Sequence, residues 1–259
     1  MTVVVKLGGS VITEKERPET LDGAALDRAA DTVADHVADR PADDPGVVVV
    51  HGGGSFGHHH ADEHGVSTAA GTHDADAVAA VHGAMKTLDR FVLARLHERD
   101  VPAVPVHPLS AGARVATGDS TATDGTLDLS PSAPATLLGE GFVPVLHGDG
   151  VATAGAGVTV VSGDELVVAL AEELDADRVG LCSTVPGVLD GDGAVVPEVT
   201  AFDDVADALD ASDATDVTGG MAAKVRELLA LDVPASVFDL DGLGPFLDGG
   251  RPGTTIRGE

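Results

Sequence analysis

Two short stretches of this sequence combine glycine with residue types that bind anions. The first is "KLGGS" at residues 6–10, and the second is "HGGGSFGHHH" at residues 51–60. Glycine has no Cβ, so backbone N–H groups can close on an anion, and a following helix adds the positive end of its dipole. A tight strand-to-helix turn would use the same glycines. Two such loops in one chain nevertheless predict a site that holds two phosphate groups.

Lysine is scarce in the chain, and its placement supports the same chemistry. Of the four lysines, Lys6 lies in the first glycine loop, Lys15 lies just beyond it, and Lys224 ends the glycine-containing stretch "TGGMAAK". A lysine ammonium is a mobile point charge that can follow a phosphoryl group during transfer. We therefore predict phosphoryl transfer, with an ordinary surface position as the alternative for each of these three. Lys86, in the middle of a predicted helix, is expected to be structural.

Histidines crowd the second glycine loop. His58 closes its glycines and could donate a hydrogen bond to a phosphate oxygen, whereas His51 ends the preceding strand and is expected to be structural. His60 and His64 have i, i+4 spacing, which could bind a metal if the stretch is helical. The simpler interpretation of His59, His60 and His64 is an exposed polar cluster, and we predict no metal site from the sequence.

The composition limits the partners. The 259 residues include 43 Asp plus Glu against 15 Lys plus Arg, for a formal net charge of −28. A surface this acidic repels nucleic acids and anionic membranes, and a hydrophobic content of 43% indicates a folded chain. Scattered acids with few lysines resemble the proteins of salt-loving archaea, which implies a halophilic cytoplasm. The single cysteine, Cys182, excludes a disulfide framework and is expected to be a buried, inert thiol.

The hydrophobic pattern predicts the elements that position these loops. Continuous apolar runs of the kind found in parallel sheets alternate with segments of helical periodicity, and we find neither a secretion signal nor a membrane-length apolar stretch. The chain is therefore expected to be cytoplasmic and to form one α/β domain, 1–259, a three-layer α/β/α sandwich with a mostly parallel central sheet. The predicted strands are 2–7, 46–51, 101–107, 142–148, 177–183 and 234–240; the predicted helices are 22–39, 74–99, 131–139, 163–174, 202–210 and 220–231; hairpins are expected at 114–129 and 151–161.

Five motifs, in this order, resemble the amino acid kinase superfamily: "VVVKLGGSVITEK", "HGGGSFGH", "PVLHGD", "VVSGDELVVALAEEL" and "DVTGGMAAKV". Within it, "GGGSFGH" together with "TGGMxxK" is similar to the isopentenyl phosphate kinases. That resemblance implies the amino acid kinase fold and an activity that phosphorylates isopentenyl phosphate with MgATP in isoprenoid biosynthesis. It also implies a homodimer, with acceptor binding in about 1–150 and nucleotide binding in about 151–259. The sequence departs from the family after His58, where proline is more usual than histidine.

The resemblance also implies roles for individual residues. Catalysis would fall to Lys6, Lys15, His58 and Lys224. The nucleotide would contact Lys6, Leu7, Gly8, Gly9, Ser10, Gly54, Asp164, Gly220 and Lys224, with Asp164 orienting the lysines or a magnesium ion. The acceptor phosphate would contact Gly53, His58 and Asp149.

Physical chemistry agrees with a phosphate acceptor. An alkyl monophosphate has a second pKa of about 6, so it is largely a dianion at neutral pH and needs no general base. Its apolar tail is expected against the helix that carries Val78, Val81, Met85 and Phe91, although ordinary core packing would explain these residues equally well. Two alternatives stay open: a kinase of another small phosphate or phosphonate, of the fosfomycin-kinase type, and a non-catalytic nucleotide- or metal-binding protein of the same fold.

Overall fold

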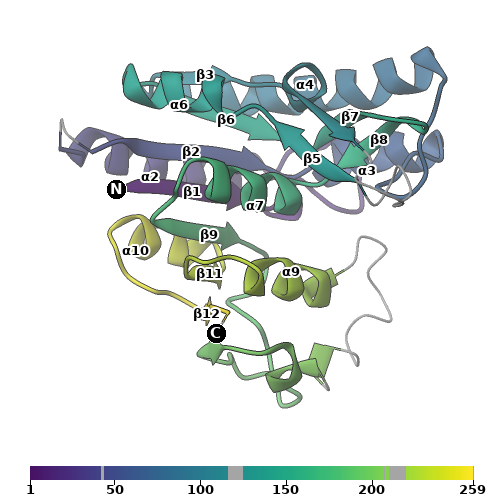
Figure 1. Ribbon diagram of the computed structural model, residues 1–259. Coiled ribbons are helices and arrows are strands. Elements are labelled where there is room, and N and C mark those ends of the chain that lie inside the picture. Colours follow the sequence, from purple (N-terminus) through teal and green to yellow (C-terminus); the bar gives the residue numbers. More distant parts are fainter. Residues whose placement is uncertain (42–43, 116–124, 207, 210–219, 259) are drawn as a thin grey trace.

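A mostly parallel sheet forms the centre of the computed structural model, which describes residues 1–41, 44–115, 125–206, 208–209 and 220–258 (Figure 1). Among these residues, eight strands pair in the order β10-β12-β11-β9-β1-β2-β6-β3. Neighbouring strands are parallel except for β11 and β12. The strands are β1 (Thr2–Leu7), β2 (Gly46–His51), β3 (Ala103–Pro105), β6 (Val143–His147), β9 (Arg178–Cys182), β10 (Glu198–Val199), β11 (Ala235–Phe238) and β12 (Thr254–Ile256).

Helices cover both faces of this sheet, so the predicted three-layer sandwich is confirmed (Figure 1). Alternate residues of one strand point to opposite faces, and in β2 Val47 and Val49 join one core while Val48 and Val50 join the other. The first core contains side chains of α2 (Gly23–Asp39), α4 (Ala75–His97) and α10 (Leu243–Leu247). The second contains side chains of α6 (Ser132–Gly139), α7 (Gly163–Glu173) and α9 (Gly220–Leu229).

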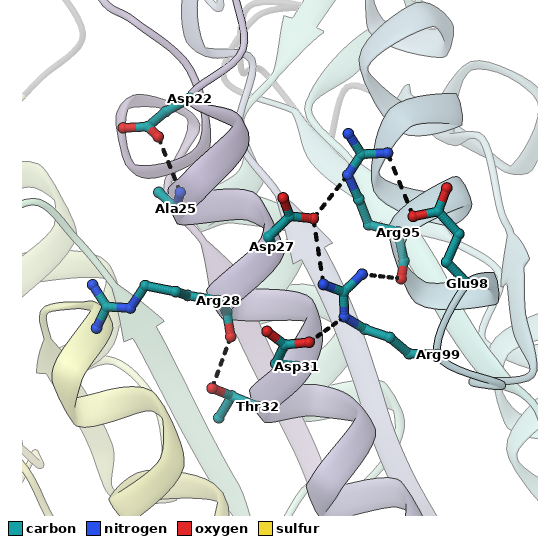
Figure 2. Close-up of polar contacts among 9 residues, drawn as sticks. All are labelled: Asp22, Ala25, Asp27, Arg28, Asp31, Thr32, Arg95, Glu98 and Arg99. Carbon is teal, nitrogen blue, oxygen red and sulfur yellow. Dashed lines mark hydrogen bonds and ion pairs between the residues drawn. The ribbon is translucent and has the colours of Figure 1, made fainter.

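Charged side chains join α2 to α4 at the outer surface (Figure 2). Arg95 donates to Asp27 at 2.9 Å, and Arg99 contacts both Asp27 and Asp31. The hydrogen bond from Arg99 to Asp31 raises the pKa of the Arg99 guanidinium. These ion pairs are partly exposed to solvent, so each adds little stability. The two helices are held mainly by the apolar side chains that they bury against the sheet.

A second, four-stranded sheet lies beside the carboxyl ends of the central strands, in the order β5-β4-β7-β8. The hairpin of β7 (Asp149–Thr153) and β8 (Gly157–Val161) confirms the one predicted at 151–161. The predicted hairpin at 114–129 is also confirmed, because β4 (Gly112–Val115) and β5 (Thr126–Leu129) pair antiparallel. Its residues 116–124 lie outside the described part of the chain.

The structure differs from the predicted elements at a few places. The predicted strand 101–107 is short because Pro102 and Pro105 lack the N–H that a ladder needs. The predicted helix 202–210 begins as a 3₁₀ turn, Phe202–Asp204, and residues 207 and 210 of it lie outside the described residues. The sequence analysis did not predict α10 or β12. In the described residues no helix is both long enough and apolar enough to cross a bilayer.

Candidate active site

The two glycine loops lie against each other at the carboxyl ends of β1 and β2, where Leu7 is paired with His51. A Cβ added to Gly9 would lie 2.1 Å from the Gly54 nitrogen, and one added to Gly52 would lie 2.6 Å from the Gly9 nitrogen. Backbone atoms cannot yield at such distances, so the absence of a Cβ lets the loops touch. The glycines therefore have a packing role between the loops as well as the predicted anion-binding role.

Both loops lead directly into helices. Gly9 and Ser10 begin the short helix α1 (Gly9–Ile12), and Gly54 begins α3 (Gly54–Glu63), so residues 54–60 are helical rather than loop. Gly54 has a φ of +50°, a conformation that favours glycine. The first N–H groups of a helix have no partner within it and are suited to an anion. The Gly8 N–H, in contrast, is donated to the Cys182 carbonyl at 2.9 Å, so this one of the predicted phosphate-binding groups already has a partner in the fold.

Lys6 and Lys224 converge on one carboxylate, Asp164. The Lys6 Nζ donates to Asp164 Oδ1 at 2.6 Å, and the Lys224 Nζ lies 3.8 Å from Asp164 Oδ2. The three residues come from β1, α7 and α9, which are far apart in the sequence. Gly163 makes room for the lysine, because a Cβ there would lie 3.0 Å from the Lys6 Cε. The structure thus brings together three of the predicted nucleotide-binding residues.

The electrostatics of this group favour an added anion. Burial lowers the pKa of the Lys6 ammonium, Asp164 opposes that shift, and the neighbouring Lys224 adds to it. Burial by itself would raise the pKa of Asp164, but Lys6 and Lys224 outweigh it and the net shift is downward. Two ammonium groups therefore share one ionised carboxylate in a half-buried site. A phosphate would neutralise the remaining positive charge.

Glu227, on α9 one turn beyond Lys224, faces the same group. One of its carboxylate oxygens, Oε2, is buried and has no hydrogen-bond partner among the described residues. Burial, with the nearby charges of Asp164 and Glu165, raises the pKa of Glu227 to about 7. Glu165 itself is held by Arg114 of β4 at 2.6 Å. The unpartnered Oε2 of Glu227 could therefore accept a hydrogen bond from a bound ligand or coordinate a cation.

The raised pKa of Glu227 predicts a specific pH dependence of stability. Its folded-state pKa of about 7 lies above the ordinary value of 4.5, so the folded chain holds the extra proton between these two values. The stabilisation is complete below pH 4.5 and is lost as the pH rises through 7. Glu227→Gln is therefore expected to melt at a higher temperature than the wild type at pH 8, and the advantage should shrink at pH 5. Melting curves that differ equally at both pH values would contradict this.

Asp149 is buried at the start of β7 and is held by a histidine on α4. Its two oxygens lie 3.0 and 2.9 Å from His82 Nδ1, which must donate because a carboxylate accepts. Burial raises the pKa of Asp149, and His82 opposes that shift. Asp149 is 1% exposed and its carboxylate accepts from His82, so its predicted contact with the acceptor phosphate stays a prediction.

His82 lines an apolar pocket of about 500 Å³. Its walls are side chains of α4 together with Leu109 and the hairpin residue Val158. Of the residues predicted to meet an apolar tail, Val78 lines this pocket. The others do not: Val81 and Met85 are core residues, and Phe91 is 39% exposed. The full lining is Thr72, His73, Ala75, Val78, Ala79, His82, Leu109, Gly157 and Val158.

The remaining predicted residues lie at the following places. His58 is exposed on α3 and Lys15 is exposed in the turn after α1, where Lys15 forms no ion pair with the described residues. Gly220 begins α9 with φ +54°, and its carbonyl accepts from Lys224 at 3.4 Å; the preceding part of that motif, 216–219, lies outside the described residues. His51 is buried at the end of β2, and Lys86 is exposed on α4. His59 is exposed and His60 is partly exposed, as expected for a polar surface cluster.

The helix α3 contains His60 but ends at Glu63, and His64 is the residue that follows it, so the metal alternative is met only at His60. His60, Glu63 and His64 place one ligand atom each within 4.8 Å of one another. The His60 Nε2, however, lies 2.8 Å from Glu19, and the cluster is largely exposed. An exposed polar cluster therefore remains our interpretation. The single cysteine, Cys182, is buried as predicted. Burial raises the pKa of its thiol to about 12, so the thiol is inert.

Comparison with known proteins places this site in a family. The sequence profile described as the amino acid kinase family matches residues 1–231. The chain belongs to this family. An isopentenyl phosphate kinase from Haloferax volcanii is 63% identical to this chain over 99% of each chain. Another, from Methanothermobacter thermautotrophicus, is 33% identical over 88% of this chain and 86% of its own. A solved isopentenyl phosphate kinase structure superposes with a TM-score of 0.80 at 26% identity, covering 99% of this chain and 100% of its own.

Two residues near the site, Glu227 and His82, were not predicted from the sequence. Glu227 lies three residues after Lys224, so the two share a helix face, and that spacing could have revealed it. His82 has no comparable signal, because a single histidine in an amphipathic helix is equally typical of a helix surface. Only its contact with Asp149, 67 positions away in the sequence, identifies it.

Proposed function

We propose that this chain is an ATP-dependent kinase that phosphorylates isopentenyl phosphate to isopentenyl diphosphate. The observation that carries the proposal is the apolar pocket beside Asp149, at the same end of the sheet as the paired lysines. A branched five-carbon tail is apolar and would bury its surface there, whereas an amino acid acceptor would bring charged groups into an apolar space. The name of the Haloferax volcanii relative supports the same acceptor.

The proposed donor side is built from the two lysines and the first glycine loop. Lys6 and Lys224 would neutralise the β- and γ-phosphates of ATP, and the N–H groups of Gly9, Ser10 and Gly54 would hold phosphate oxygens. Asp164 keeps the two ammonium groups in place. Lys15, exposed near the loop, would approach the transferred group when nucleotide is bound.

The proposed acceptor side lies two strands away. Parallel strands are about 4.8 Å apart, so the carboxyl ends of β1 and β6 are separated by about 10 Å, with the β2 loop between them. Gly53 and the exposed His58 would contact the acceptor phosphate, and the tail would enter the pocket lined by His82. The acceptor is already a dianion, so the residues position and neutralise rather than remove a proton.

The carboxylates fit a magnesium ion. Mg²⁺ usually binds to one or two carboxylates plus substrate phosphates, and Asp164 and the unpartnered oxygen of Glu227 are available near the lysines. When bound, Mg²⁺ would neutralise charge on the nucleotide phosphates. The same proposal includes a homodimer in the cytoplasm, and a net charge of −28 is expected to require high salt to screen self-repulsion.

A panel of acceptors tests the function. With MgATP in molar KCl, isopentenyl phosphate is expected to turn over fastest, and a short phosphonate such as fosfomycin slowly or not at all. Rapid turnover of another phosphate with negligible turnover of isopentenyl phosphate would overturn the proposed acceptor. ATP binding without transfer to any acceptor would favour the non-catalytic alternative.

His58→Ala tests the acceptor contact. We expect the KM for isopentenyl phosphate to rise by about 10-fold or more, as for a lost hydrogen bond to a charged group, while the KM for ATP stays unchanged. His59→Ala is the matched control, because His59 is the next residue of α3 and is also exposed. Equal kinetics for the two variants would remove His58 from the acceptor site.

A further inference from the structure

Three histidines lie side by side at the carboxyl ends of three neighbouring strands. His51 of β2 is paired with His147 of β6, and the β3–β6 register, continued past Pro105, places His107 beside His147. The rings of His51 and His147 are 5.4 Å apart, and those of His107 and His147 are 5.1 Å apart. All three are on the sheet face that packs against α4. The row continues towards the acceptor pocket, because the rings of His107 and His82 are 5.7 Å apart.

Hydrogen bonds fix which ring nitrogens point inward. His51 Nδ1 lies 3.2 Å from the Gly52 carbonyl, and His147 Nδ1 lies 3.0 Å from the Gly148 carbonyl. A carbonyl only accepts, so both Nδ1 atoms carry the proton. In the neutral rings the lone pairs are then on Nε2, directed into the interior. Backbone contacts of this kind orient histidines that bind metals.

A buried carboxylate on α4 faces these lone pairs. The Asp89 side chain is 2% exposed, and its Oδ1 lies 3.5 Å from His51 Nε2. Both atoms are buried, and neither has a hydrogen-bond partner among the described residues. The separation is longer than a charge-assisted hydrogen bond of about 2.8 Å. It is close to the roughly 3.3 Å between two ligands of a tetrahedral ion whose bonds are about 2.0–2.1 Å.

We propose that Asp89, His107 and His147 bind a divalent transition-metal ion of the Zn²⁺ class. These three place one ligand atom each within 4.8 Å of one another. His51 Nε2 lies 3.5 Å from Asp89 Oδ1 but is outside this group of three, so its ring would have to shift to become a fourth ligand. His107 Nδ1 and His147 Nε2 are 2.8 Å apart and share a hydrogen bond, which His107 donates because the His147 proton is on Nδ1. Metal binding would move that proton to His107 Nε2 and separate the two nitrogens by about 0.5 Å, to the ligand spacing. Imidazole nitrogens with one carboxylate are a typical zinc donor set.

The charges of the site support a cation. Asp89, His51 and His147 are all buried, and each is at most 1% exposed. The Asp89 Oδ1 is buried and has no hydrogen-bond partner among the described residues. A bound cation would compensate this oxygen, because an unpaired buried charge is costly. The ion would tie two strand ends to α4 and is separate from any Mg²⁺ bound with nucleotide.

Metal content tests this proposal, and it does so independently of the kinase reaction. Tag-free protein is unfolded in urea with a chelator and refolded with Zn²⁺ or Co²⁺. After dialysis, elemental analysis is expected to find one ion per chain, and Co²⁺ should give the intense visible bands of a four-coordinate site. Less than about a tenth of an ion per chain in both refolded samples would overturn the proposal.

Three variants separate this site from the surface cluster. Asp89→Asn and His107→Gln are expected to lose the ion, and the partly exposed His107 is the safer of the two for folding. His64→Ala is the matched control, because it removes a ligand of the exposed His60–Glu63–His64 group instead. Circular dichroism establishes that each variant is folded. Loss of the ion from His64→Ala alone, or full retention in folded His107→Gln, would overturn the assignment.

Discussion

Lys6→Met is expected to lower kcat by about 10²–10³-fold, the loss typical of removing one group that stabilises developing charge. The Lys6 ammonium is 2.6 Å from Asp164 and beside Lys224, so its removal takes away the best-positioned positive charge at the end of β1. Methionine is similar in length to lysine and has no charge. It is suited to this position because Lys6 is buried, with 7% of its surface exposed. Steady-state kinetics at saturating ATP and acceptor measure the effect.

The control for this variant is Lys86→Met, an exposed lysine of α4 that has no proposed role in transfer. It removes the same charge from the chain and should leave kcat within about twofold of the wild type. Thermal melting of both variants separates lost chemistry from lost folding, because removing Lys6 leaves Asp164, among the described residues, with Lys224 at 3.8 Å as its remaining ion-pair partner. A folded Lys6→Met enzyme with normal kcat would exclude Lys6 from catalysis.

Gly9→Ala is expected to damage both stability and activity. The added Cβ would lie 2.1 Å from the Gly54 nitrogen and 2.6 Å from its Cα, so the two loops must separate. Overpacking of this kind costs about 1–3 kcal/mol of unfolding free energy. A displacement of about 1 Å between donor and acceptor loops lowers kcat/KM by about 100-fold. Urea unfolding and steady-state kinetics measure the two effects.

Gly23→Ala is the matched control for the glycine prediction. Gly23 begins α2, and a Cβ there would meet nothing within 4 Å. Alanine is a better helix former than glycine, so this variant should be as stable as the wild type or slightly more stable, with unchanged kinetics. If Gly9→Ala behaved like Gly23→Ala, the loops would not be in the contact described.

The local parts of this fold follow from the sequence because each depends on neighbouring residues. The runs "TVVVKL" and "GVVVVH" predict buried parallel strands, and the structure confirms both with the predicted bounds. The glycine loops were recognisable for the same reason. The helical start of the second loop was not, because a histidine- and glycine-rich stretch has low helix propensity and α3 depends on packing against α4.

The composition supplied a further signal. In a chain with only four lysines, the positions of Lys6 and Lys224 beside glycines predicted that they belong to one site, and the structure places both on Asp164. The sequence could not show that Glu227 joins them with a raised pKa, since burial creates that shift. Nor could it show which α4 side chains line the pocket and which fill the core.

By itself the sequence determined the alternation of strands and helices, the glycine loops at the strand ends and the family resemblance. These properties depend on periodicity and on residues within a few positions of each other. Only the tertiary structure decided which distant groups meet: Asp149 with His82, Gly9 with Gly54, and Asp89 with the row of three histidines. Those contacts depend on strand order and register, which bring residues many tens of positions apart to within bonding distance.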